Sequence, residues 1–261
     1  MFAWVAFLAA LLLFQVQLVL GKQLLPWFGG TSAVWTTCLL FFQAALLAGY
    51  LWAHVLAARL PARRQRDAHL SLLAAALALL AWRAASWPSP IAPGDAGRPA
   101  AGAPVLGILL WLGSTIGLPF VALAATSPLL QAWFARARPG RSPFRLFAFS
   151  NAGSLAGLAG YPLLVEPLAP VAGQGWAWSV GFAVLAAGVA SCAAKAAAAP
   201  EPPAAEPAPA PAPAGDERPR TGLWLALAFA PSVLLCAVTS HLTQEVAAVP
   251  LLWTLPLALY L

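Results

Sequence analysis

The sequence predicts an all-α, polytopic integral membrane protein, and three observations support this fold class. Of its 261 residues, 61% are hydrophobic and only 8% are charged, whereas soluble domains carry about 25% charged residues. Several runs contain no charged residue, and a helix of about 20 such residues crosses the hydrocarbon core of a bilayer. The basic residues stand between these runs rather than in one patch, so the net charge of +6 does not indicate a nucleic-acid partner. The expected partner is the lipid bilayer.

Apolar runs and turns divide the chain into eight expected spans. They cover residues 2–20, 33–56, 69–82, 105–130, 146–165, 172–194, 222–238 and 246–261. Residues 26–30 form the turn between the first two spans. Pro119 and Pro128 are expected to kink the fourth span, because proline lacks a backbone donor. Five prolines and three glycines between residues 86 and 104 indicate an external loop.

Composition divides these spans into two groups. Residues 1–194 are expected to form a six-helix membrane bundle, and residues 222–261 contain two further helices. Residues 195–221 between them are rich in proline and alanine, a composition typical of an extended, solvated linker. The chain is still apolar at Leu261, so we expect it to be a truncated part of a longer protein.

The basic residues predict the orientation in the membrane. With a cytoplasmic N-terminus, eleven of the 14 Lys and Arg residues fall on the inside, and only Lys22, Arg83 and Arg98 fall on the outside. Cytoplasmic loops carry an excess of basic residues. We therefore expect a multi-pass protein with a cytoplasmic N-terminus. The third span is short, so Arg83 at its end is expected to reach toward the lipid headgroups.

No motif in the sequence indicates catalysis. The sequence contains no Walker loop, no GxSxG and no HExxH, and no GxGxxG follows a predicted strand. We therefore assign no catalytic residue, no cofactor and no metal ligand. His54, His69 and His241 lie near the ends of spans, where a lone histidine is usually a solvated or hydrogen-bonded end residue.

Uncharged polar residues inside the spans allow two interpretations. Gln15, Gln17, Gln43 and Asn151 would be costly to expose to lipid, so they are expected to face the interior of the bundle. They either make hydrogen bonds between helices or line a polar substrate cavity.

Small residues in the fifth span indicate close helix packing. Gly153 and Gly157 are four residues apart, and Gly160 follows. This spacing allows two helix backbones to approach closely. We therefore expect Gly153, Gly157 and Gly160 to pack against a neighbouring helix.

Several strings of the sequence carry a family resemblance. They are FQVQ at 14–17, LPWFGG at 25–30, ATSPLLQAWF at 125–134, RLFAFSNAGSL at 145–155 and HLTQE at 241–245. They resemble the membrane part of bacterial fused major-facilitator/spermidine-synthase-like proteins. The resemblance implies a major-facilitator-like bundle in the bacterial inner membrane, here with six helices of one half and two of a second.

The resemblance also implies a function. The chain would be an anchor, a regulatory module or a substrate-feeding module for an aminopropyltransferase-like domain, which binds decarboxylated S-adenosylmethionine and an amine. No counterpart of that domain's glycine-rich loop or acidic pair occurs in these residues. The alternative is half of a small-solute transporter of the major-facilitator type. No Asp or Glu lies in the middle of a span, which disfavours polyamine transport.

One charge pair is expected at the outer side. Lys22 and Glu166 lie near the outer ends of the first and fifth spans, which are neighbours in a major-facilitator half. They form either an ion pair or two independently solvated charges.

Overall fold

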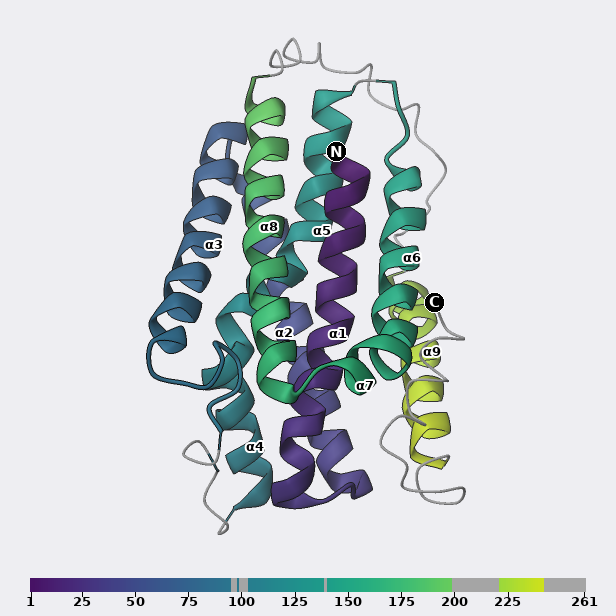
Figure 1. The fold of residues 1–261 in the computed structure, drawn as a ribbon. Helices are drawn as coiled ribbons and strands as arrows, with labels where there is room; N and C mark the ends of the chain where they lie inside the picture. The colour runs from purple at the N-terminus through teal and green to yellow at the C-terminus, as the bar shows by residue number, and fades with distance from the viewer. Residues whose placement is uncertain (95–97, 99–102, 139, 199–220, 242–261) are drawn as a thin grey trace.

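The computed structural model describes residues 1–94, 98, 103–138, 140–198 and 221–241, and the elements in these ranges are helices (Figure 1). In chain order they are α1 Phe2–Phe28, α2 Ser32–Arg59, α3 Ala62–Ala84, α4 Pro104–Leu112, α5 Leu118–Ala137, α6 Phe144–Gly160, α7 Glu166–Leu168, α8 Val171–Ala197 and α9 Thr221–His241. Two π-helical turns, Gly113–Gly117 and Tyr161–Val165, join α4 to α5 and α6 to α7. Most of the predicted linker and all of the predicted span 246–261 lie outside the described residues.

Glycine and proline mark the helix ends. Gly29 follows the last residue of α1 and has a positive φ of 73°, a backbone conformation that favours glycine. Pro61, Pro104 and Pro170 stand at or directly before the first residue of α3, α4 and α8. At these places the missing N–H of proline costs no helical hydrogen bond. The chain therefore turns where its sequence interrupts the helical hydrogen bonds.

Several helices are longer than the sequence analysis predicted, and α1 and α3 show why. α1 continues past Leu20 to Phe28, and α3 begins at Ala62 instead of His69. Lysine and arginine are good helix formers, so Lys22 and the arginines at 63–66 do not end a helix. The prediction used charged residues as span limits, and this was wrong at both places.

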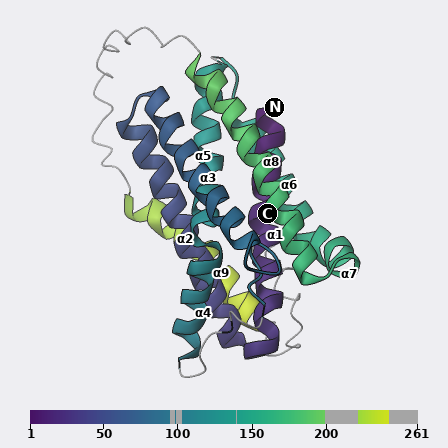
Figure 2. The same ribbon diagram turned by 60° about the vertical axis from the view of Figure 1, so that its left-hand side comes forward.

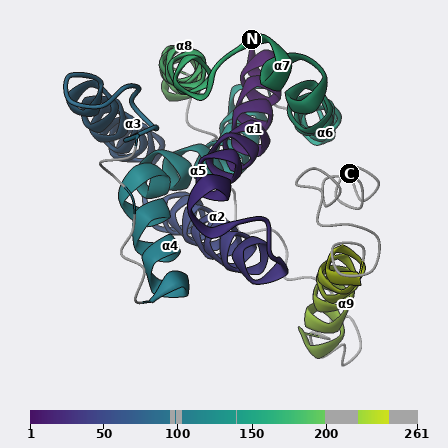
Figure 3. The same ribbon diagram turned by 60° about the horizontal axis from the view of Figure 1, so that its bottom comes forward.

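α1 and α5 occupy the centre of the bundle. α1 packs against α6 and α8, and α5 packs against α2, α3 and α8. Figure 3 shows these outer helices around the central two. Figure 2 shows α4 and α5 following each other beside α2, which contacts both. Large side chains fill the core, and Trp133, Trp178 and Phe182 are each at most 1% exposed.

Five helical segments are long and apolar enough to cross a membrane. They are α1, α2, α3, residues 104–137 and α8. The segment 144–168 is divided into α6, a π-helical turn and α7, and α6 alone has 17 residues. α9 lies apart from the bundle in Figure 3, and most of its described side chains are exposed. The structure therefore supports a polytopic membrane protein, with five candidate spans among the described residues rather than the predicted eight.

Basic residues gather at one end of the bundle. The upper end in Figure 1 holds the N-terminus, the α2–α3 and α5–α6 connections and the end of α8. We call it the basic end, because its described residues include Arg59, Arg63, Arg64, Arg66, Arg136, Arg138, Arg141, Arg145 and Lys195. The opposite end carries Lys22, Arg83, Arg98 and Glu166. Most of the described basic residues thus lie at one end of the bundle, as the predicted orientation requires.

Arg83 does not reach toward the headgroups as expected. It is 5% exposed, and its Nη1 and Nη2 donate to the backbone oxygens of Thr115 and Ser114. Pro119 lies four residues after Thr115 and has no N–H to offer that carbonyl. The sequence predicted a kink at Pro119, and the structure has a π-helical turn directly before it. Arg83 donates the hydrogen bond to the Thr115 carbonyl that Pro119 cannot donate.

The connection at 86–104 is not wholly an external loop. Residues 89–93 are buried, and they lie against the last turns of α1 and the first turns of α8. Gln23 donates through Nε2 to the backbone oxygen of Ile91 at 3.3 Å, and Trp176 donates through Nε1 to that of Pro88 at 3.0 Å. The prolines prevent helix formation here. The segment is nevertheless buried, because side chains of neighbouring helices donate hydrogen bonds to its backbone carbonyls.

Candidate functional site

The contact between α1 and α6 brings the two helix backbones close together. A Cβ added at Gly157 would lie 2.7 Å from the carbonyl oxygen of Leu11, and one at Gly153 would overlap the backbone of Phe7. Real Cβ atoms do not approach backbone atoms so closely, so only glycine fits at either position. Gly160 is different, because a Cβ there would meet nothing within 4 Å. Packed helices cross at an angle, so α6 has moved away from α1 by the time it reaches Gly160, its last residue.

A cavity of about 420 Å³ opens beside this contact, between α1, α2, α5 and α6. Six of its lining side chains carry hydrogen-bonding groups, and we call it the polar cavity. They are Tyr50, Ser127, Gln131, Ser150, Asn151 and Ser154. The rest of the lining is apolar and includes Phe14 and Phe147. The cavity lies in the half of the bundle nearer the basic end, because its α5 and α6 residues are close to the α5–α6 connection.

Four of these polar groups have no partner in the described part of the chain. The side chains of Gln131, Tyr50, Ser127 and Ser150 make no hydrogen bond to any described residue. Ser154 donates to the backbone oxygen of Ser150 at 3.0 Å, which leaves its oxygen lone pairs free to accept. In a membrane such groups require a partner, because an unpaired amide in hydrocarbon costs several kcal/mol.

Only one of the four residues predicted to line a polar cavity does so. Asn151 lines it and has an interaction partner within the chain. Gln17 instead donates to the backbone oxygen of Leu13 at 3.2 Å, one turn earlier in α1. Gln43 is exposed on α2, and Gln15 is outside the lining. Gln17 shares a helix face with the lining residues Leu13 and Phe14, but it lies one turn beyond the cavity. Gln43 likewise lies one turn before the lining residue Leu46.

The residues that were missed carry a detectable signal. Ser127 and Gln131 are four residues apart in α5, and Ser150 and Ser154 are four residues apart in α6. Each pair therefore shares one helix face. Two such faces on consecutive spans indicate a shared polar surface.

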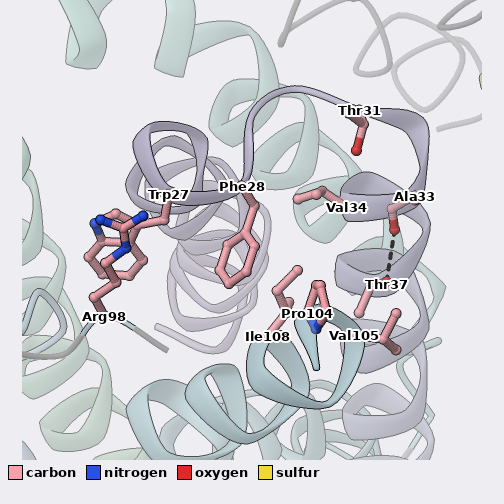
Figure 4. A pocket seen from close by; sticks show the side chains of 10 residues that line it. All are labelled: Trp27, Phe28, Thr31, Ala33, Val34, Thr37, Arg98, Pro104, Val105 and Ile108. Atoms are coloured by element: carbon pink, nitrogen blue, oxygen red, sulfur yellow. Dashed lines mark hydrogen bonds between the residues drawn. The ribbon is translucent and has the colours of Figure 1, made fainter. Parts of the chain in front are cut away.

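A second cavity, of about 430 Å³, lies at the opposite end. Figure 4 shows Trp27 and Phe28 from the end of α1, Thr37 from α2 and Ile108 from α4 around it. Thr37 already donates to the backbone oxygen of Ala33 at 2.8 Å. The lining is largely apolar, with Arg98 as its single charged residue among those described. This pocket offers fewer free hydrogen-bonding groups than the polar cavity.

The structure brings Lys22 and Glu166 together. The Nζ of Lys22 in α1 lies 2.9 Å from Oε1 of Glu166, the first residue of α7. Their side chains are 32% and 33% exposed, so solvent screens part of the attraction. The ion pair joins the C-terminal part of α1 to α7 at the end of the bundle that lies away from the basic end.

His69 is hydrogen-bonded, one of the two expected alternatives, but it lies in the core and not at a solvated end of a span. It is fully buried between α3 and α5, and its Nε2 lies 3.2 Å from the hydroxyl oxygen of Thr126. Thr126 gives its own proton to the carbonyl of Ala122 at 2.8 Å, so it accepts a hydrogen bond from Nε2–H of His69. One turn earlier, Gln65 accepts from Nε1 of Trp133 at 3.2 Å. These contacts are structural, because they fill the core between two helices.

Neither a metal centre nor a known relative defines the site. No group of three or more His, Cys, Asp or Glu among the described residues is placed to hold a metal ion. The polar cavity is therefore the candidate functional site, and its chemistry is neutral hydrogen bonding. Comparison of the chain with protein-family models, curated proteins and solved structures finds no match.

Proposed function

We propose that the chain is the membrane domain of a spermidine synthase-like fusion protein and that its polar cavity binds a small polar molecule. In this proposal the domain anchors, regulates or feeds an aminopropyltransferase-like domain that these 261 residues do not contain. The basic end faces the cytoplasm, following the excess of basic residues in cytoplasmic loops.

One observation carries this proposal. Two of the strings that resemble the family, at 125–134 and 145–155, lie on α5 and α6 and meet at the polar cavity. They supply Ser127, Gln131, Ser150, Asn151 and Ser154, and the second string also contains Gly153, which lets α6 approach α1. Two of the five resembling strings therefore meet where hydrogen-bonding side chains line a cavity.

A cysteine-accessibility experiment tests whether the cavity is open to water. All three native cysteines are replaced, and Ser127→Cys is treated with a small hydrophilic thiol reagent in inside-out membrane vesicles. We expect modification, because a binding cavity must be reached by water. Ser191→Cys is the matched control, since Ser191 is exposed on α8 outside the cavity, on a surface that would face lipid. An unreactive Ser127→Cys would contradict the proposal.

The helix arrangement favours a second candidate, half of a small-solute transporter of the major-facilitator type. Such halves contain two inverted repeats of three helices. In this arrangement α1, α2 and α3 form the first repeat, and residues 104–137, α6 and α8 form the second. The first helix of each repeat then packs against the second helix of the other, as α1 does against α6 and α5 against α2. The third helices of the two repeats, α3 and α8, also contact each other. The same symmetry would place a substrate near the middle of the membrane.

The coding sequence downstream of the Leu261 codon distinguishes the two candidates. A glycine-rich strand–turn–helix pattern supports the spermidine synthase-like protein. Four further spans followed by a stop codon support the transporter.

A further inference from the structure

We infer that the polar cavity binds an uncharged molecule of nucleoside size that contains a flat, hydrogen-bonding ring. This inference rests on the proposed function, which leaves the chemical class of the bound molecule open. Three properties of the cavity lead to it: the absence of charge in its lining, the mixture of donors and acceptors, and the aromatic rings.

The lining carries no counter-charge for an ion. None of its described residues is Asp, Glu, Lys, Arg or His. An ammonium or phosphate group taken from water into a low-dielectric site loses several kcal/mol of hydration, which only an opposite charge or many hydrogen bonds can offset. A polyamine or a nucleotide would meet no such charge here. The bound molecule is therefore neutral.

The polar groups require a molecule that both donates and accepts. The carboxamide of Gln131 has two N–H donors and an oxygen acceptor, and the hydroxyls of Tyr50, Ser127 and Ser150 each donate and accept. These groups come from α2, α5 and α6, so they surround the cavity instead of forming one row. A carboxamide also matches the hydrogen-bonding edge of a purine, as in its bidentate contacts with adenine.

Aromatic rings form part of the remaining, apolar surface. Phe14 of α1, Tyr50 of α2 and Phe147 of α6 line the cavity from three helices. Flat heterocyclic rings stack on such side chains. The volume of about 420 Å³ lies within the range of about 300–1,000 Å³ that is usual for small-molecule sites. A purine nucleoside combines the required size, neutrality, ring and hydroxyl groups.

Thermal unfolding of the purified 261-residue chain in lipid nanodiscs tests the inference, with adenosine as the probe. AMP adds a charged phosphate to the same nucleoside, and spermidine represents the polyamine cations. We expect adenosine to raise Tm by about 2–4 °C at concentrations well above its Kd, and neither AMP nor spermidine to do so.

Two variants show whether the effect comes from the cavity. Gln131→Leu is expected to abolish the adenosine shift, whereas Gln43→Leu makes the same chemical change outside the lining and is expected to keep it. Ser127→Ala is a smaller change that retains the fold, and it is expected to raise the Kd of adenosine about three- to tenfold.

The outcomes separate this inference from the proposed function. If AMP or spermidine gives a shift that Gln131→Leu removes, the cavity binds a charged molecule and only the inference is overturned. The same holds if Ser127→Cys is water-accessible but adenosine gives no shift. If Ser127→Cys is unreactive, both are overturned.

Discussion

Arg83 of α3 donates through Nη1 to the backbone oxygen of Thr115, the carbonyl that Pro119 leaves without a partner in its own helix. The guanidinium also lies 4.8 Å from the ring centroid of Trp87. A buried charge is thus used to complete the hydrogen bonding of an irregular helix.

This relationship predicts an interaction between two mutations. Arg83→Met is expected to destabilise the bundle by about 2–4 kcal/mol, because it leaves the buried carbonyl of Thr115 and the partly buried carbonyl of Ser114 unpaired. Pro119→Ala restores an N–H for Thr115, so the loss caused by Arg83→Met is expected to be at least about 1 kcal/mol smaller in that background. A double-mutant cycle of unfolding free energies in detergent measures the difference. Arg66→Met is the control, because Arg66 pairs only with its neighbour Asp67 among the described residues. Additive effects would contradict the proposed role of Arg83.

The ion pair between Lys22 and Glu166 predicts a charge-reversal effect. Lys22→Glu is expected to lower Tm in detergent, because it replaces the attraction across the present 2.9 Å contact by repulsion between two negative charges. Adding Glu166→Lys is expected to restore part of the loss. The net contribution is small, about 1 kcal/mol or less, because both side chains are about one-third exposed. A double variant that is no more stable than the sum of the single losses would show that the charges act independently.

The contact of α1 with α6 predicts a difference between three glycines. Gly153→Ala and Gly157→Ala are expected to destabilise the bundle by about 1–3 kcal/mol, because the new Cβ overlaps the backbone of α1. Gly160→Ala is expected to be neutral or slightly stabilising, since its Cβ meets nothing within 4 Å. Thermal unfolding of the three variants in the same detergent checks this order. Equal losses at all three positions would contradict the contact.

The hydrogen bond between His69 and Thr126 predicts a loss on removing its acceptor. Thr126→Val keeps the shape of the side chain but leaves Nε2–H of His69 unpaired in the core, at a cost of about 1–3 kcal/mol. Thr36→Val makes the same change on an exposed face of α2, where the hydroxyl bonds only within its own helix, and is expected to change stability little. Unfolding free energies of the two variants give the comparison.

The positions of the basic residues predict which end faces the cytoplasm. In a cysteine-free background, Arg64→Cys and Arg141→Cys are expected to resist an impermeant thiol reagent in intact cells, whereas Ser86→Cys at the opposite end is expected to react. Ser86 is exposed, and its backbone conformation accepts any residue. Labelling of Arg64→Cys from outside would reverse the orientation.

The sequence alone determined the class of the protein and the position of most helix ends. The length of an apolar run shows whether it can cross a bilayer. Proline and glycine change the backbone locally, as Gly29 and Pro119 show, so their effect can be predicted from the sequence. Spacing also identified Gly153 and Gly157, because helical periodicity is a local property.

Only the tertiary structure decided which polar side chains meet. Gln17 and Gln131 are both amides within apolar helices, yet Gln17 bonds to its own helix and Gln131 lines the polar cavity. The difference depends on where each residue lies along its helix relative to the cavity and on which helices are its neighbours. The same reason applies to Arg83 and His69, which lie near the ends of predicted spans but are buried by α4 and α5. Contacts between helices far apart in the chain are set by packing, and no local pattern of residues determines that packing.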